Sequence, residues 1–109
     1  MPTQEDIVGR ALELKDLISY QDGAVVSKTL IDRGQGTITL FSFDKGQGLS
    51  EHTAPFDAFV QVVDGTAEVT ISGTPHAVRA GEIIIMPADH PHSLRATERF
   101  KMLLVMIRA

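Results

Sequence analysis

Two stretches of the chain decide its fold: GQGLSEHTAPFDAFVQVVDG at residues 46–65 and GEIIIMPADHPH at residues 81–92. Each stretch sets one histidine at a fixed distance from residues that interrupt regular structure. In the first stretch, five residues separate Gly46 from His52, and twelve separate His52 from Gly65. Because glycine is a strong marker of turns, His52 is expected near turns that lie among short strands.

The second stretch has the same construction. Five residues separate Gly81 from Pro87, and four separate Pro87 from His92. Proline is confined to the edges and ends of strands, so Pro87 is expected to end the strand before it. The pattern predicts that His52 and His92, forty residues apart, converge at the open end of a small barrel.

Short runs of strand-forming residues surround both stretches. Strands are predicted at residues 24–31, 37–43, 58–63, 67–71, 75–79, 83–86, 92–96 and 102–107. Strands repeating roughly every 8–12 residues are typical of a sandwich or barrel. Asp64-Gly65 is a strong hairpin signal, and it predicts a turn between two of these strands. Residues 83–86 are apolar on both faces, which predicts a central strand.

The beginning of the chain carries the one helical signal. Residues 5–17 have weak helical periodicity, and Lys15-Asp16-Leu17-Ile18 are expected to form one turn. Ala11-Leu12-Glu13-Leu14 fit a short edge strand equally well. We therefore expect residues 1–20 to form an N-terminal arm and residues 21–109 to form a single barrel.

Composition excludes several classes of protein. The chain has 109 residues, which fits one domain, with 43% hydrophobic and 22% charged residues. It has no cysteine, which excludes disulfides and thiolate metal sites. With a net charge of −4 and no basic run, it is not expected to bind nucleic acid.

The longest apolar run, Met102–Ile107, is too short to cross a membrane. The polar, acidic N-terminus is unlike a signal peptide, so a cytoplasmic protein is expected.

The two stretches resemble the paired motifs of the cupin superfamily, over Gly46 to about Ala96. In the first motif Gly46, His52 and Gly65 match, and in the second Gly81, Pro87 and His92 match. The chain departs from the pattern at four positions. Ala54 stands at the second histidine, Ala58 at the glutamate, Asp89 at a glycine and Ala96 at an asparagine. The resemblance implies an all-β, RmlC-like double-stranded β-helix (a jelly-roll barrel), here with a short N-terminal helical turn.

The resemblance also implies a metal site that is half lost. Cupins with the full motif hold a divalent metal with three histidines and a glutamate, and only His52 and His92 remain here. Open metal sites usually keep three protein ligands, so a third is needed or the site is weak. His90 is the first candidate, since residues two apart share a strand face. Its alternative is an exposed loop histidine. The metals that would suit such ligands are Zn, Ni, Mn and Fe.

Other polar residues are candidates of lower rank. His76 shares a strand face with Val78 and is expected to point inward, as a ligand or as a buried, hydrogen-bonded histidine. Gln61 and Asp57 have the wrong parity relative to Ala58, unless a bulge intervenes. Asp57 and Asp89 lie near the two histidines in sequence, where they could orient an imidazole or begin a turn.

Small residues at 54 and 58 enlarge the expected pocket and make it less polar. Val60 and Met86 are predicted to contact a ligand there, together with the two histidines. Further residues that could line the pocket or pack beneath it are Val62, Ile38, Leu40, Phe41, Phe43 and Met102. A mostly apolar cavity with a few polar groups is typical of small-molecule sites.

Binding of a small molecule is therefore favoured over catalysis, because the ligand set is incomplete. The alternative is a metal-dependent enzyme of the dioxygenase, isomerase or decarboxylase type acting on a small organic substrate. The resemblance to cupins also implies a dimer, since cupins commonly form dimers. The apolar C-terminal strand and residues 24–31 fit an interface between two copies. A homodimer is expected on this basis.

Overall fold

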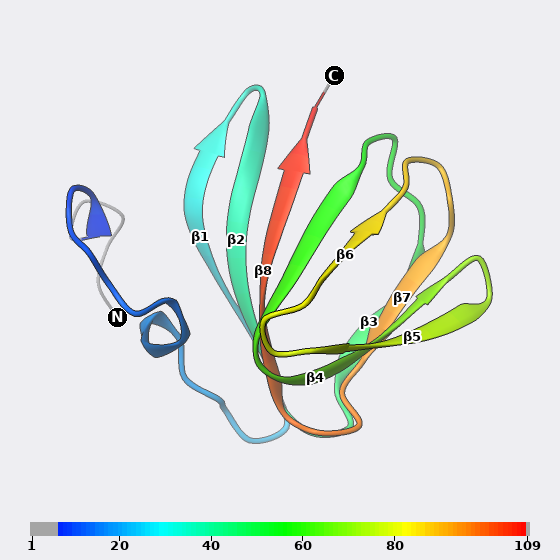
Figure 1. Cartoon of the computed structure of the whole chain (residues 1–109), viewed down its shortest axis with the longest axis horizontal. Helices are drawn as coiled ribbons and strands as arrows, with labels where there is room; N and C mark the ends of the chain where they lie inside the picture. The colour runs from blue at the N-terminus through cyan, green and yellow to red at the C-terminus, as the bar shows by residue number, and fades with distance from the viewer. Residues whose placement is uncertain (1–6, 109) are drawn as a thin grey trace.

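The structure, a computed structural model, describes residues 7–108. It is built almost entirely from strands (Figure 1). One 3-10 turn, η1 (Leu14–Leu17), precedes eight strands: β1 (Val25–Arg33), β2 (Gly36–Phe43), β3 (Gly48–His52), β4 (Ala58–Ile71), β5 (Thr74–Arg79), β6 (Ile83–Met86), β7 (His92–Arg95) and β8 (Phe100–Ile107). The all-β fold class and the short N-terminal helical turn predicted from the sequence are confirmed.

All strand pairs are antiparallel, and β4 belongs to two sheets. The strands follow the order β1-β2-β8-β4-β7-β3, with β5 and β6 also paired to β4. Residues 58–65 of β4 pair with β8 and β6, whereas residues 66–71 pair with β5 and β7. Figure 1 shows β4 running along one sheet, bending, and continuing in the other. The sheets therefore form two walls joined through one long strand.

The predicted hairpin at Asp64-Gly65 is wrong. The chain bends there but continues as the same strand, with a register shift between Val62 and Asp64 on the β8 side. Gly65 has a φ of 74°, a backbone conformation that suits glycine. The dipeptide thus makes a corner between the two sheets. A hairpin would have separated residues 58–63 from residues 67–71.

Other sequence expectations need smaller corrections. Residues 83–86 form an edge strand, because β6 pairs with β4 alone among the described strands. Ile83 and Ile85 are accordingly about half exposed, at 52% and 55%. Residues 48–52, for which no strand was expected, form β3. Residues 11–13 are outside regular structure, so the edge-strand alternative for the arm is wrong.

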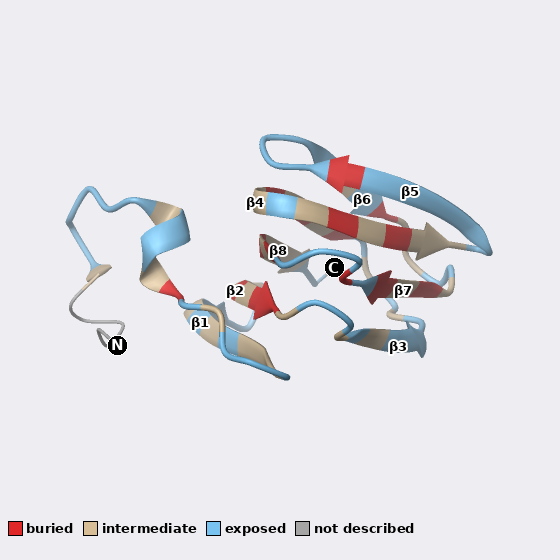
Figure 2. Cartoon of the chain, turned by 90° about the horizontal axis from the view of Figure 1, so that it is seen from below, coloured by how far each residue is buried: buried red, intermediate tan, exposed pale blue. Residues whose placement is uncertain are grey.

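The hydrophobic core lies between the two walls. Figure 2 shows buried residues alternating with less buried ones along β4, as expected for a strand with one inward face. Fully buried side chains include Val60, Val62 and Val69 of β4. Phe43 and Phe100 stack within the core with ring centroids 4.4 Å apart. This packing holds the ends of β2 and β8 together.

The arm packs on the barrel beside β2, β4 and β8. Ile18 is 2% exposed, and Ser42 Oγ donates a hydrogen bond to the Ser19 carbonyl at 3.0 Å. The Tyr20 hydroxyl donates to Asp64 Oδ2 at 2.5 Å, and burial together with this bond raises the pKa of Tyr20. Within residues 7–108, the structure has no helix with the length and apolar character needed to cross a membrane.

Candidate functional site

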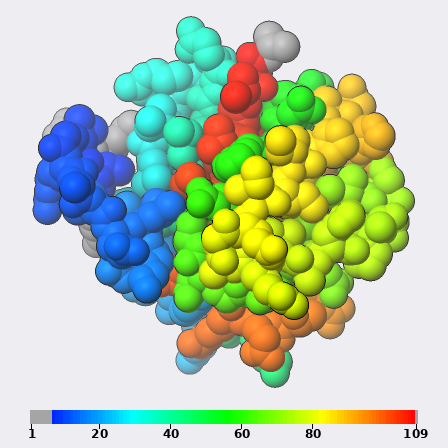
Figure 3. All heavy atoms as spheres, in the orientation of Figure 1, coloured from blue at the N-terminus to red at the C-terminus, as the bar shows by residue number. Residues whose placement is uncertain are grey.

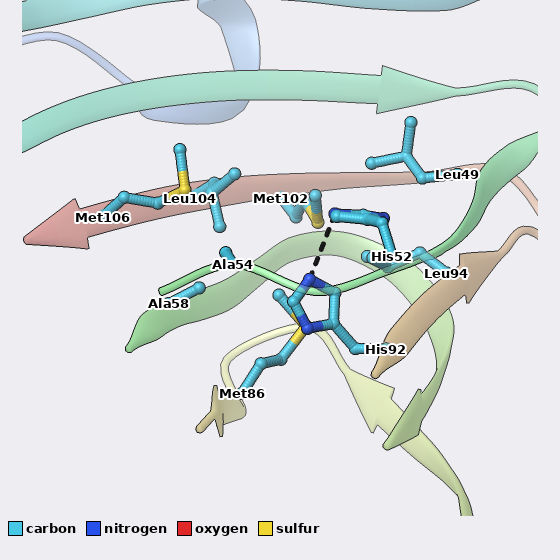
Figure 4. Close-up of a pocket in the computed structure, with 10 residues that line it drawn as sticks. All are labelled: Leu49, His52, Ala54, Ala58, Met86, His92, Leu94, Met102, Leu104 and Met106. Atoms are coloured by element: carbon cyan, nitrogen blue, oxygen red, sulfur yellow. Dashed lines mark hydrogen bonds between the residues drawn. The ribbon is translucent and has the colours of Figure 1, made fainter. Parts of the chain in front are cut away.

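Strand pairing brings the two framed histidines together. His52 ends β3, His92 begins β7, and the two residues are directly opposite each other in the register of these antiparallel strands. Their Nε2 atoms are 3.1 Å apart, with ring centroids at 4.4 Å and the rings inclined by 76°. The prediction that these imidazoles converge is confirmed (Figure 4).

The loops beside the histidines are also tied to each other. The Asp89 N–H donates to the Ala54 carbonyl at 2.8 Å, and the Ala88 N–H donates to Asp57 Oδ1 at 2.8 Å. These bonds join the loop after β3 to the loop before β7. Asp89 has a φ of 64°, which explains why the cupin motif has glycine here and why aspartate is tolerated. The two aspartates position the loops, and no hydrogen bond joins either to an imidazole in the described structure.

The carbonyl of Ser50 fixes the tautomer of His52. His52 Nδ1 lies 2.7 Å from this oxygen, and a carbonyl oxygen only accepts, so Nδ1 carries the proton. In the neutral ring, Nε2 then has a free lone pair. The 3.1 Å contact therefore requires His92 Nε2–H to donate to His52 Nε2.

His92 is buried in a less polar setting. It is 3% exposed, and its Nδ1 has no hydrogen-bond partner of acceptable geometry in the described structure. Burial lowers the pKa of His92 below the ordinary value of 6.5, and His52 lowers it further, while the His90 backbone acts in the opposite direction. The ring is consequently neutral at pH 7, with a free acceptor at Nδ1.

The histidine pair borders a small cavity with mostly apolar walls. Its volume is about 40 Å³, measured as the space open to the centre of a water molecule, which is room for roughly three waters. The lining residues, drawn in Figure 4, are Leu49, His52, Ala54, Ala58, Met86, His92, Leu94, Met102, Leu104 and Met106. One polar end and apolar walls suit a small amphipathic ligand.

The structure separates the predicted lining residues into two groups. Met86 and Met102 line the cavity, as do Ala54 and Ala58. Val60 is fully buried in the core and is not among the residues that line the cavity, so the structure does not place it where a ligand there would contact it. None of five further residues lines the cavity: Val62, Leu40 and Phe43 are fully buried, and Ile38 and Phe41 are partly buried. Packing within the barrel was the alternative expected for them.

Four lining residues were missed from the sequence. Leu94 follows His92 by two positions, and Leu104 and Met106 follow Met102 by two and four. Residues two apart in a strand share a face, so the parity of His92 and Met102 was a sufficient signal. Leu49 was missed because β3 itself was not predicted.

The other histidines lie outside this arrangement. His90 is exposed, and its Nδ1 lies 3.2 Å from Ser72 Oγ. His76 is exposed on β5, in contrast to the inward orientation expected from Val78, which is buried. Within residues 7–108, no group of three histidine, aspartate or glutamate side chains is placed to hold a metal. The structure therefore does not bring His90 into a three-ligand set.

The histidine pair meets part of the geometry that a divalent metal requires. Two imidazole nitrogens bound to one such ion at about 2.0–2.1 Å are roughly 2.9–3.4 Å apart, and the Nε2 spacing of 3.1 Å falls in this range. A bound metal would move the His92 proton to Nδ1, leaving a buried donor without a partner at a cost of about 1–3 kcal/mol. With two nitrogens, no carboxylate and this penalty, the residues do not fit a tightly held divalent ion.

A small antiparallel β-barrel with a histidine pair at one end of an internal cavity defines the class of protein. The family model for the cupin domain matches residues 39–108. The chain therefore belongs to the cupin family, as the two sequence motifs predicted. Ala54 and Ala58, which stand at the second histidine and the glutamate of the cupin motif, both line the cavity.

Similar proteins are known in several bacteria. A conserved protein of unknown function from Streptococcus pyogenes is 40% identical, with a TM-score of 0.89 over 93% of this chain and 89% of that one. A cupin 2 conserved barrel domain protein from Leptotrichia buccalis is 41% identical, with a TM-score of 0.87 over 89% of this chain and 47% of that one. Protein SchB from Streptomyces halstedii is 31% identical over 75 residues, 68% of this chain. The chain spans about half of SchB, 54% of its length.

Proposed function

We propose that this protein binds a small molecule through the histidine pair. The ligand has one hydroxyl or carboxyl group and a short apolar body. The observation that carries the proposal is the pairing of His52 Nε2 with His92 Nε2, 3.1 Å apart, at a cavity whose other lining residues are apolar.

The hydrogen-bonding state of the pair specifies the head group. His92 Nε2–H is a donor and His52 Nε2 is an acceptor, so a hydroxyl inserted between them can satisfy both. A carboxylate would bind together with a proton, because an isolated negative charge in an apolar cavity is unfavourable. Burial lowers the pKa of His92 and keeps this ring neutral at pH 7, which favours these uncharged partners.

The walls specify the body of the ligand. Eight of the ten lining residues are alanine, leucine or methionine. Methionine side chains are flexible and adapt to irregular shapes, so Met86, Met102 and Met106 can move to admit a few carbon atoms. A cavity of about 40 Å³ is well below the roughly 300–1,000 Å³ of sites for drug-sized molecules. Short-chain acids, alcohols and phenols are therefore the expected ligands.

A thermal-shift screen followed by calorimetry tests this proposal. Short carboxylic acids, alcohols and phenols should raise the melting temperature as ligands of the folded state. His92→Phe and His52→Phe keep an aromatic ring but remove the nitrogens, and each should weaken binding about tenfold or more. His76→Phe, at an exposed position on β5, is the matched control and should bind as the wild type does. Equal affinity in all three variants, or no stabilising compound in these classes, would refute the proposal.

A metal-dependent enzyme of the dioxygenase, isomerase or decarboxylase type is the second candidate. The Nε2 spacing favours it, since 3.1 Å suits two ligands of one ion. His52 and His92 would hold Zn, Ni, Mn or Fe weakly, with the remaining positions open to substrate. Elemental analysis after reconstitution tests this reading, and less than about a tenth of an equivalent of metal would exclude it.

We also propose that the protein is a homodimer. The outward faces of β6, β4, β8 and β2 carry Ile85, Phe59, Val105 and Ile38 in register across four strands. The chain around β6, yellow in Figure 3, lies at the surface over β4. Stacking two copies on this face would remove an apolar row from water.

A further inference from the structure

The cavity contains a second kind of metal ligand. All three methionines of the described residues, Met86, Met102 and Met106, line it together with the histidine pair. Figure 4 draws the three methionine side chains among the residues that surround the two imidazoles in this cavity. Thioether sulfur is a soft, polarisable donor, and it changes which ions the site can accept.

We propose that this cavity binds one Cu(I) ion through His52 Nε2, His92 Nε2 and the Met102 thioether, with Met86 as a fourth donor. This inference goes beyond small-molecule binding and does not depend on it. It assigns a ligand of a different chemical class to the same cavity. Soft thioether ligands select Cu(I) among biological metal ions, and imidazole is also a good ligand for copper.

The charge of the site favours a monovalent ion. Two neutral imidazoles and thioethers contribute no negative charge, and no carboxylate joins the histidines in a group of three within the described residues. The cost of moving an ion out of water rises with the square of its charge, so a divalent ion is penalised about four times as strongly as a monovalent one. A neutral ligand set in an apolar cavity therefore discriminates against Zn, Ni, Mn and Fe. Binding through both Nε2 atoms moves the His92 proton to buried Nδ1 for Cu(I) as for a divalent ion, at the same cost of about 1–3 kcal/mol. The thioether bonds and the lower desolvation cost are therefore what distinguish Cu(I).

The dimensions of the site also suit a bare ion. Two nitrogens at about 2.0 Å from a metal and 3.1 Å from each other subtend an angle of roughly 100°, which leaves room for one or two sulfur ligands. The cavity volume of about 40 Å³ accepts an ion without a hydration shell. Met102 is fully buried and Met86 is 3% exposed, so the sulfur side of the site is shielded from bulk water, whereas His52 on the other side is exposed.

Competition with a chromogenic chelator tests the proposal on the full chain. Under anaerobic conditions with ascorbate, the protein should withdraw one equivalent of Cu(I) from its bicinchoninate complex. An excess of Zn²⁺ should not prevent this. Met102→Leu removes the sulfur while nearly conserving side-chain volume, and it should lower Cu(I) affinity at least tenfold. His76→Phe, outside the cavity, is the matched control and should bind like the wild type.

A second measurement identifies the copper ligands in the wild-type protein, so its result does not depend on whether Met102→Leu folds normally. X-ray absorption at the copper edge, on protein labelled with selenomethionine, should show selenium in the first coordination shell of copper. Failure of the wild type to withdraw Cu(I), or a copper shell without selenium, would overturn the proposal. Retention of wild-type Cu(I) affinity in both Met102→Leu and Met86→Leu would also overturn it. Small-molecule binding is measured without copper, so either proposal can fail while the other stands.

Discussion

Replacing Gly65 with alanine should destabilise the protein far more than the same replacement at Gly73. Both glycines have positive φ, 74° and 82°, and alanine there costs about 1–2 kcal/mol. Around Gly73 a methyl group would meet nothing within 4 Å. At Gly65 it would overlap the Arg99 carbonyl oxygen and stand 3.0 Å from Phe100 Cα, so β8 would have to move.

The additional cost at Gly65 follows from what β8 holds there. Gly65 pairs with Phe100, whose ring is fully buried against Phe43. Displacing this pairing sacrifices about 1 kcal/mol of hydrogen bonding and about 1–3 kcal/mol of packing. Gly65→Ala should therefore cost roughly 2–4 kcal/mol more than Gly73→Ala, a large part of the 5–15 kcal/mol that stabilises a typical domain.

Urea unfolding of the two variants measures this difference. With a slope of about 1.5 kcal/mol per molar urea, the midpoint of Gly65→Ala should lie roughly 1.3–2.7 M below that of Gly73→Ala. The comparison cancels the shared cost of positive φ. Equal midpoints would refute the conclusion that β4 bends at Gly65 while pressed against β8.

Three further predictions concern the site and the surface. Folding lowers the pKa of His92, so below about pH 6.5 the unfolded chain binds a proton at this ring before the folded chain does. The free energy of unfolding should therefore fall with pH by at most about 1.4 kcal/mol per pH unit. His92→Gln should show a shallower pH dependence in urea unfolding, and a pH profile identical to that of the wild type would count against a lowered pKa of His92. Asp57→Ala removes the acceptor of the Ala88 N–H and should cost about 0.5–1.5 kcal/mol of stability. It should also weaken ligand binding several-fold in calorimetry, and unchanged affinity would show that this loop contact does not position the histidines. Ile85→Glu should convert a micromolar dimer to monomer in sedimentation, whereas Val8→Glu in the arm should not; a wild-type monomer would exclude the proposed interface.

The sequence was sufficient for the family and for the centre of the site. Glycine and proline at fixed distances from His52 and His92 identified the cupin motifs, and these motifs placed both imidazoles at one end of the barrel. Tertiary pairing decided what lay beyond the motifs. Asp64-Gly65 is a hairpin signal by local criteria, but β8 and β7 pair with successive halves of β4 and require a bend instead.

Burial also depended on pairing that no local pattern reports. The Ile83–Met86 run has the composition of a central strand, yet it pairs with β4 alone among the described strands and leaves two isoleucines half exposed. Val60 has the parity of an inward residue, and it does point inward, but the core covers it completely. The alternation of residues along a strand predicts whether a side chain points inward or outward. How deeply an inward side chain is buried depends on the packing of the opposite sheet, which the alternation does not report.

The central claim is that His92 Nε2–H donates a hydrogen bond to His52 Nε2 at the cavity. Long-range ¹H–¹⁵N NMR of the imidazole nitrogens at neutral pH tests it most directly, with resonances assigned from single histidine variants. We predict a proton on Nδ1 of His52 and on Nε2 of His92, with both rings shifting together when a ligand binds. A proton on Nε2 of His52, or two rings that respond to ligand independently of each other, would contradict the account.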